Sequence, residues 1–486
     1  MKHLSTLILG MLLALGAQAQ ESPTGNAVRI NPGDSLPVIL KKAAHIIPSA
    51  RQISWQELEF TVFIHFGMNT FTNREWGEKG TPPSLFNPTA LDAEQWVKTA
   101  KMAGAKLLII VAKHHDGFCL WPSRFTDYSV KNSPWKGGKG DVVGEVAAAC
   151  KKHGMKLGIY LSPWDMNSPL YGTEAYNEHF RNQLTELLTL YGPVDEVWFD
   201  GACGEGPNGK RQVYDWLSYY RVARMLQPQA VIAVTGPDVR WVGTESGYGR
   251  ETEWSVVPAP ASALKDIALT SAEKVMKEGV FFPIGDMMEQ DLGSREKIAQ
   301  AGALIWYPSE VDVSIRPGWF YHPGEDSLVK SAETLTDIWY SSVGRNSVLL
   351  LNLPPDRRGL IHENDVAALK KMKSLLDATF SNNLAKNAAV FKNDSSMLVR
   401  FPAPVLFDRA MLQEDFRHGQ RVESFILESF NGNGWKEIAR GTTIGYKRLL
   451  RFEPVKTDKV RLRITSSRDV SEISHFGLYK APAEKR

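Results

Sequence analysis

Apolar strand-like runs alternate with amphipathic helix patterns between residues 60 and 355, and this alternation limits the possible folds more than any other feature. The strand-like runs are 61–66, 107–111, 157–161, 196–199 and 231–234. Helix patterns lie at 91–104, 141–153, 174–191 and 213–226. The runs are apolar throughout rather than alternating, which is typical of parallel strands that helices cover.

Three later runs bring the count of strands to eight. They are 252–256, 304–313 and 348–353. Eight strand–helix units favour a closed (β/α)8 barrel, and we predict this α/β fold for residues 51–360. A doubly wound open sheet is the alternative, but no GxGxxG or Walker-type loop follows the first strand.

The pattern changes after residue 360. Residues 361–382 are expected to form a helical connector, with the helix itself at 363–378. Short alternating runs such as 424–430 and 460–464 follow, with turn signals such as Asn431-Gly432-Asn433-Gly434 between them. We therefore predict a β-sandwich domain over residues 383–486, with a structural role.

The first 19 residues have the features of a secretory signal peptide. A basic start is followed by an apolar run from Leu4 to Leu15, and Ala17-Gln18-Ala19 fits cleavage before Gln20. The run is short for a membrane span, and no cysteine follows it to carry a lipid anchor. We expect export, to the periplasm or beyond, without membrane insertion, and a lead-in segment at 20–50.

The composition argues against a nucleic-acid partner and against a zinc site built from cysteines. The chain has 57 Lys and Arg against 54 Asp and Glu, a net charge of +3. This balance argues against a nucleic-acid binder, because such proteins concentrate basic charge. The three cysteines, Cys119, Cys150 and Cys203, contain no CxxC pair, so we expect buried thiols rather than a zinc site. We predict no cofactor.

Polar side chains and tryptophans stand at the ends of the predicted strands, where the active site of such a barrel lies. The residues at these ends are His65, His114, His115, Tyr160, Trp198, Asp200, Glu245, Glu310 and Asp312. A rim of indole rings, neutral donors and carboxylates suits a sugar, whose C–H faces stack on indoles and whose hydroxyls need hydrogen-bond partners. Hydrolysis of a glycoside needs two carboxyl groups with different pKa values.

Several segments together resemble glycoside hydrolase family 29, the α-L-fucosidases, over about residues 50 to 355. They are His65-Phe66-Gly67, Glu75-Trp76, residues 113–118 (Lys-His-His-Asp-Gly-Phe), residues 198–201 (Trp-Phe-Asp-Gly) and residues 347–352. The resemblance implies an exo-acting retaining enzyme without a metal. It would remove terminal α-linked L-fucose from oligosaccharides or glycoconjugates through a covalent fucosyl-enzyme.

The resemblance also implies roles for residues. Asp200, in the Trp-Phe-Asp-Gly segment, would be the nucleophile. In the branch that prefers α-1,3 and α-1,4 linkages, the acid/base is the Glu of a Trp-x-Gly-x-Glu segment, which residues 241–245 match at Glu245. Glu253, then Glu251 and Glu310, remain rivals for that role. The substrate-binding positions implied are His65, Glu75, Trp76, His114, His115, Tyr160, Trp198 and Trp319, with the histidines donating to sugar hydroxyls. The C-terminal domain resembles galactose-binding or discoidin-like sandwiches.

Two other functions stay open. A catalytically inactive fucose-binding module would keep the sugar contacts, although the retained carboxylates argue against it. A metal-dependent barrel hydrolase would use His65, His114 and His115 as ligands. Adjacent residues on an undistorted strand point to opposite faces, so His114 and His115 cannot both point inward.

Overall fold

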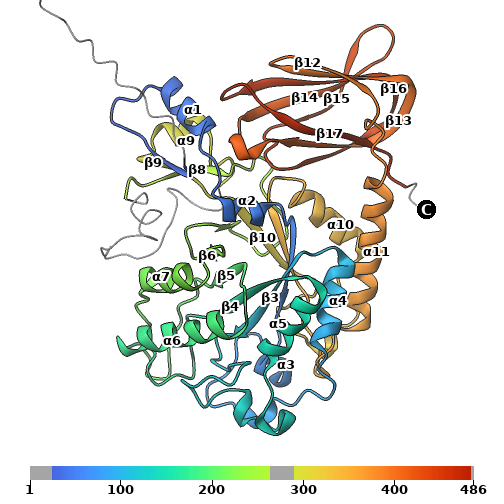
Figure 1. Ribbon diagram of the computed structural model, residues 1–486. Coiled ribbons are helices and arrows are strands. Elements are labelled where there is room, and N and C mark those ends of the chain that lie inside the picture. Colours follow the sequence, from blue (N-terminus) through green and yellow to red (C-terminus); the bar gives the residue numbers. More distant parts are fainter. Residues whose placement is uncertain (1–24, 263–288, 483–486) are drawn as a thin grey trace, which may run out of the picture.

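The structure is a computed structural model that describes residues 25–262 and 289–482 (Figure 1). The signal peptide predicted at residues 1–19 lies outside the described residues. Across the described ranges, no helix combines the length and apolar character needed to cross a membrane.

Eight parallel strands form the central sheet, with neighbours in the order β6, β5, β4, β3, β2, β11, β10, β7. Their bounds are β2 (Phe60–Ile64), β3 (Leu107–Lys113), β4 (Lys156–Leu161), β5 (Glu196–Phe199), β6 (Val231–Val234), β7 (Arg240–Trp241), β10 (Ser309–Ser314) and β11 (Val348–Asn352). A parallel bridge between Ala233 and Val239 joins the two ends of this order, so the barrel is nearly closed. All residues of β2, β3 and β11 are buried, which explains their continuous apolar runs. The predicted barrel is confirmed.

Helices surround the strands (Figure 1). They include α4 (Ala93–Ala103), α5 (Val142–His153), α6 (Ala175–Leu190), α7 (Trp216–Leu226), α10 (Ala332–Ser341) and α11 (Glu363–Phe380). Asp92 and Asp141 begin α4 and α5, because their carboxylates accept hydrogen bonds from backbone amides of the first turn. Gly104 and Gly154 end the same helices in the left-handed conformation that glycine adopts without strain. The helix predicted at 363–378 is α11, and it packs against α4 and α10.

Two of the later strands differ from the prediction. The sixth barrel strand is β7, not 252–256. Residues Val256–Ala259 instead form β8, which pairs antiparallel with β9 (Ala303–Trp306), and β9 pairs with β1 (Ala27–Arg29). The run predicted at 304–313 therefore breaks into β9 and β10 near Pro308, which has no N–H to continue a ladder. Two residues are too few for β7 to leave an apolar run in the sequence.

Short helices complete the barrel's surroundings. They are α1 (Leu36–Ala44), α2 (Ala50–Gln56), α3 (Met68–Thr72) and α9 (Arg295–Ala299). Figure 1 shows α1 and α9 beside β9 and β8, above the barrel, and β1 pairs with β9 in the same small sheet. These helices and the small three-stranded sheet pack together around an apolar cluster of their own, outside the barrel core.

The C-terminal domain consists of antiparallel strands, as the alternating pattern predicts, and the described strands pair into one six-stranded sheet where a sandwich was expected. Its strands are β12 (Ala389–Lys392), β13 (Ser396–Glu414), β14 (Val422–Phe430), β15 (Trp435–Gly441), β16 (Arg448–Ser467) and β17 (Ile473–Tyr479). The pairing of β13 with β16 shifts register twice, which bends these long strands. Val399, Phe407, Phe425 and Leu462 belong to a core that is separate from the barrel core.

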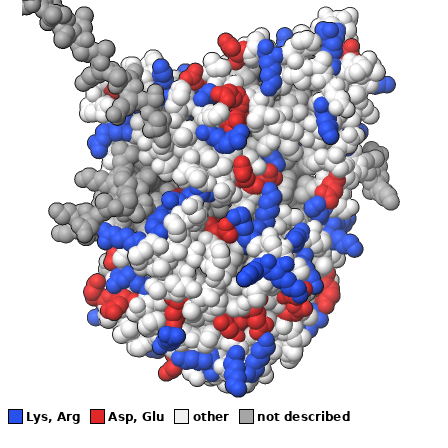
Figure 2. Space-filling view, viewed as in Figure 1, with Lys and Arg blue, Asp and Glu red and all other residues white. Residues whose placement is uncertain are grey.

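Charged side chains of both signs are interspersed on the face shown in Figure 2. All three cysteines lie in the described ranges and are free thiols. Cys119 and Cys150 are buried as expected, but Cys203 is only partly buried. Cys203 follows β5 by a few residues, so its loop faces the barrel rim rather than the core.

Candidate active site

Asp200 lies directly after β5, where the chain leaves the C-terminal end of the barrel. Its Oδ1 accepts a hydrogen bond from the backbone N–H of Ala202 at 2.7 Å, and its Oδ2 accepts one from the Tyr160 hydroxyl at 2.9 Å. Burial raises the pKa of Tyr160 well above its ordinary value, so this hydroxyl keeps its proton and donates. The carboxylate is therefore held in one orientation while 25% of its side chain stays exposed. An oriented and accessible carboxylate can act as a nucleophile.

Glu245 follows β7 and its side chain is exposed at the same rim. Its Oε2 accepts a hydrogen bond from the indole N–H of Trp319 at 3.2 Å. Its side chain is therefore open to solvent and to a ligand, and its one hydrogen bond comes from a neutral donor. Its position suits an acid/base.

The three rival acids have other partners. Glu253 is 1% exposed and forms ion pairs with Arg240 and Arg250. Glu251 forms ion pairs with two arginines near the C-terminal domain. Glu310 lies inside the barrel, where it accepts from an indole N–H. None of the three lines the cavity that holds Asp200 and Glu245.

One cavity of about 600 Å³ opens between these two carboxyls. Its described lining includes Trp198, Asp200, Ala202, Cys203, Tyr214, Trp216, Val234, Thr235, Arg240, Trp241, Glu245, Tyr307 and Asp312. Aromatic rings form much of its wall, together with a few polar and charged groups, as in many ligand sites. The cavity has the size and lining for a small carbohydrate.

His65 stands just after β2, and Asn352 at the end of β11 orients it. The amide nitrogen of Asn352 donates to Ser314 Oγ at 2.9 Å and to the carbonyl of Trp319 at 2.7 Å. The amide oxygen therefore faces His65 Nδ1 at 2.8 Å and accepts its proton. Burial lowers the pKa of His65 to about 3, so the ring is neutral and Nε2 is an acceptor. His65 thus offers a sugar hydroxyl an acceptor, rather than the donor predicted from the sequence.

His114 and His115 follow β3 with ring centroids 4.1 Å apart. Ser162 donates to the carbonyl of Trp164, so its oxygen accepts from His115 Nδ1 at 2.7 Å. The Nε2 of His115 then lies 3.8 Å from Asp200 Oδ2. Burial lowers the pKa of both histidines, and each ring is neutral. Both rings lie close together because the chain has already left the strand.

Glu75 holds a loop rather than facing the cavity. Its carboxylate accepts from the backbone N–H groups of Trp319 and Phe320, at 2.8 and 3.2 Å, and lies 2.5 Å from His322 Nε2. These bonds place the Trp319 ring 5.1 Å from the ring of His65. The adjacent Trp76 is 60% exposed, with its ring near His115 and Trp164. Trp76 therefore lies at the mouth of the site.

Two carboxyl groups lie buried beneath the site. Glu196 accepts from the indole N–H of Trp55 at 3.0 Å, and Glu310 accepts from that of Trp198 at 2.8 Å. In the described part of the chain, no other group donates a hydrogen bond to Oε1 of Glu196 or to Oε1 of Glu310. Because a carboxylate oxygen only accepts, the two side chains can bond to each other only when one of them is protonated. Burial raises the pKa of Glu196 to about 7 and that of Glu310 well above its ordinary value. The pair shares a proton and fixes Trp198, which stacks on Tyr160.

This pair predicts a pH-dependent stability. In the unfolded chain both carboxyls ionise near pH 4.3, whereas the folded chain keeps their protons to higher pH. The folded state therefore binds more protons, and its stability falls as the pH rises from about 4.5 through 7 and above. In Glu310→Gln, the amide accepts from Trp198 and donates to Glu196 without titrating. We expect its Tm, measured by calorimetry, to fall less between about pH 5 and 8 than that of the wild type.

The surface variant Glu57→Gln is the control for this measurement. If the Tm of Glu310→Gln and that of the wild type change with pH in parallel, the shared proton is contradicted.

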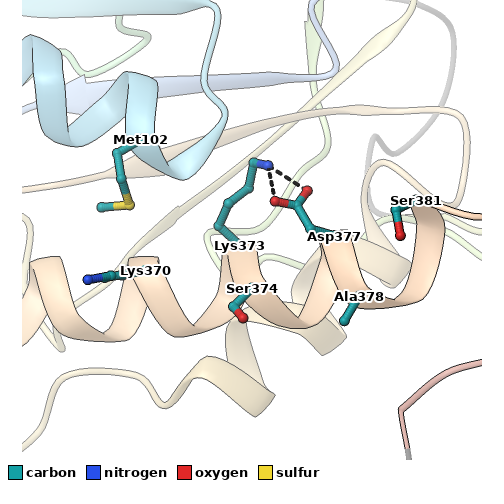
Figure 3. A pocket seen from close by; sticks show the side chains of 7 residues that line it. All are labelled: Met102, Lys370, Lys373, Ser374, Asp377, Ala378 and Ser381. Carbon is teal, nitrogen blue, oxygen red and sulfur yellow. Dashed lines mark hydrogen bonds and ion pairs between the residues drawn. The ribbon is translucent and has the colours of Figure 1, made fainter.

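A second hollow, of about 480 Å³, lies on the outside of the barrel between α4 and α11 (Figure 3). Its lining is Met102, Lys370, Lys373, Ser374, Asp377, Ala378 and Ser381. Figure 3 shows Lys373 turned toward Asp377, to which it donates two hydrogen bonds. Beside this ion pair its polar groups are Lys370 and two serines of the same helical surface.

The three histidines of the rim do not converge on one point. The Nδ1 atoms of His65 and His115 already bond to Asn352 and Ser162. Over the described ranges, a group of three potential ligands close enough to share an ion occurs in the C-terminal domain, at Asp415, His418 and Glu472, and not at these histidines. Among the described residues, the three histidines named by the metal-hydrolase alternative therefore do not form a ligand set.

All ten sequence-predicted site residues lie at the C-terminal end of the barrel. Sequence reasoning missed how Asn352, Ser162 and His322 orient them. Asn352 leaves one signal in the sequence, because it is a polar residue at the end of an otherwise apolar strand. The others lie in loops whose partners are distant in the chain.

Comparison with known proteins identifies the family to which the chain belongs. The sequence matches the α-L-fucosidase family over residues 75–379. Alpha-L-fucosidase 1 of Arabidopsis thaliana is 42% identical, over 89% of this chain and 87% of that protein. The crystal structure of a glycoside hydrolase 29 family member from an unknown rumen bacterium has 40% identity and a TM-score of 0.78, and the match covers 90% of this chain and 77% of that one. A Ruminococcus gnavus GH29 fucosidase in complex with fucose has 31% identity and a TM-score of 0.75, over 90% and 95% of the two chains. The chain therefore belongs to the α-L-fucosidases of glycoside hydrolase family 29.

Proposed function

We propose that this α-L-fucosidase retains the anomeric configuration through double displacement, with Asp200 as nucleophile and Glu245 as acid/base. Asp200 attacks the anomeric carbon while the glycosidic C–O bond breaks and Glu245 gives its proton to the leaving oxygen. Glu245 then takes a proton from water, the water oxygen attacks the same carbon, and Asp200 is released. The observation that supports this proposal is that the two carboxyls line one cavity and have different partners.

The neighbouring rings suit fucose. Trp198, Tyr160 and Trp319 offer apolar surface for the C–H face and the methyl group of this sugar. The neutral His65 and His115 each keep Nε2 as an acceptor, because their Nδ1 atoms bond to Asn352 and Ser162, and an acceptor matches the O–H of a sugar hydroxyl. The fucose named for the related Ruminococcus gnavus structure supports the same sugar here.

The stereochemistry of the first product tests the mechanism. Proton NMR of an aryl α-L-fucoside reaction should show α-L-fucose first, with the β-anomer appearing only as mutarotation proceeds. Two inversions at one carbon restore the starting configuration, whereas a single displacement by water gives the opposite anomer. Initial release of β-L-fucose would exclude the double displacement.

We infer a preference for α-1,3 and α-1,4 linkages from the Trp-x-Gly-x-Glu match at residues 241–245. A panel of α-1,2, α-1,3, α-1,4 and α-1,6 fucosyl oligosaccharides should show kcat/KM at least about tenfold higher for the 1,3 and 1,4 members. The measured quantity is free fucose at equal enzyme concentration. Equal rates across the panel, or fastest cleavage of the 1,2 or 1,6 member, would reject this preference.

We also propose export, with cleavage before Gln20 and a periplasmic destination. The basic start, apolar run and Ala17-Gln18-Ala19 site support this proposal. N-terminal sequencing of the enzyme from a periplasmic fraction should begin at Gln20. An intact Met1 would reject cleavage.

A further inference from the structure

Asp312 is a third carboxyl of the cavity, in addition to Asp200 and Glu245. It lies on β10, two residues after Glu310, so both side chains are on the same face of the strand. That face points into the barrel, because Glu310 bonds to Trp198 there. Asp312 is one layer nearer the C-terminal end and is only 3% exposed.

The groups around Asp312 favour the protonated form of its carboxyl. The indole N–H of Trp241 donates to its Oδ1 at 2.8 Å. Among the described residues, no ion pair to Asp312 is found, and Arg240, which lines the same cavity, pairs with Glu253. The carboxyls of Glu245 and Glu310 are its charged neighbours. Burial, and then these two neighbouring acids, raise the pKa of Asp312 well above its ordinary value. A carboxylate here would be a buried charge without a counterion, which is costly.

We propose that Asp312 binds substrate as a neutral carboxylic acid, donating a hydrogen bond from Oδ2 to an oxygen atom of the sugar in the cavity. Oδ1 is already occupied by Trp241, so the O–H on Oδ2 is the group that remains for a ligand. Glycosidic and ring oxygens only accept hydrogen bonds, and the neutral acid supplies a donor without adding charge. The inference rests on the proposed function in one respect, that the cavity between Asp200 and Glu245 holds the substrate.

Three variants of the full-length enzyme test this role. Asp312→Asn keeps both functions, because the amide oxygen accepts from Trp241 and the amide nitrogen donates. Asp312→Leu removes both functions. Trp241→Phe removes the bond between the two residues and keeps an aromatic ring in the cavity wall. We expect kcat/KM to stay within about fivefold of wild type for Asp312→Asn, and to fall about tenfold or more for Asp312→Leu, with a smaller loss for Trp241→Phe.

Each variant is assayed with an aryl α-L-fucoside and with a fucosyl oligosaccharide. A loss confined to the oligosaccharide places the donated bond on the leaving sugar, and a loss on both substrates places it on fucose; either supports the proposal. A thermal melt identifies a variant that fails to fold, and Asp312→Ala then replaces Asp312→Leu.

Two results would overturn the proposal. If Asp312→Asn loses as much activity as Asp312→Leu, an ionised carboxylate is required. If Trp241→Phe reproduces the whole loss, or if Asp312→Leu shows none, Asp312 acts only through Trp241 or not at all. Because these comparisons are ratios measured in an active enzyme, their failure leaves the roles of Asp200 and Glu245 untouched. Failure of those roles would instead appear as unchanged turnover in an Asp200→Ala variant.

Discussion

Replacing Asp200 with alanine is expected to abolish the release of fucose, with a fall in kcat of about 10⁴-fold or more. The carboxylate is held by the hydroxyl of Tyr160 and the backbone N–H of Ala202, so its oxygen is aimed before substrate binds. Alanine leaves those donors in place and removes the carboxylate, including its attacking oxygen. The loss should therefore fall on kcat, with little change in the affinity for fucose, which calorimetry measures.

A small external anion should restore part of this activity. Azide or formate can enter the space left by the missing carboxylate and attack the anomeric carbon in its place. With azide, the product should be a β-fucosyl azide, since only one inversion takes place. Asp127→Ala is the matched control, because Asp127 has a side chain that is 93% exposed on an outer loop. Unchanged turnover in Asp200→Ala would exclude Asp200 as the nucleophile. An equal fall in kcat in Asp127→Ala would exclude it as well.

The barrel could be predicted from sequence because its main strands are buried on both faces. Such strands leave continuous apolar runs, as in β3 and β11, and the helices between them carry their own start and stop residues. β7 could not be found this way, since its two residues are too short to leave a pattern. Residues 303–306 also look like a barrel strand although they pair with β8 and β1, because burial alone does not identify the partner strand.

The site was predictable by position and less so by role. Strand ends locate His65, Asp200 and Glu245, because the C-terminal ends of parallel strands meet at one rim. The role of each group depends on partners far away in the chain, which no local pattern records. Asn352 fixes the tautomer of His65 across 287 residues. Glu75 binds the backbone of a loop 244 residues away, rather than facing the cavity.

Replacing Glu245 with alanine should reduce activity in proportion to how much the leaving group needs a proton. The leaving oxygen of an oligosaccharide is strongly basic, so loss of the acid should lower kcat/KM by about 10²- to 10⁴-fold. An activated aryl leaving group departs as a stable anion, so its cleavage should fall much less. Steady-state rates on the two substrates give the ratio that tests this role.

The nearby acids provide the controls for this test. Glu251→Gln changes a carboxyl six residues away that pairs with Arg345 and Arg448, and it should leave the ratio of the two substrates at the wild-type value. Glu253 is buried between Arg240 and Arg250, so its replacement should lower the Tm and reduce both rates together. Loss of the acid/base differs from the loss of Glu251 or Glu253, because it lowers the rate more for the oligosaccharide than for the activated aryl fucoside. Equal losses on both substrates for Glu245→Ala would therefore transfer the proton-donor role to another residue, whatever the size of the loss.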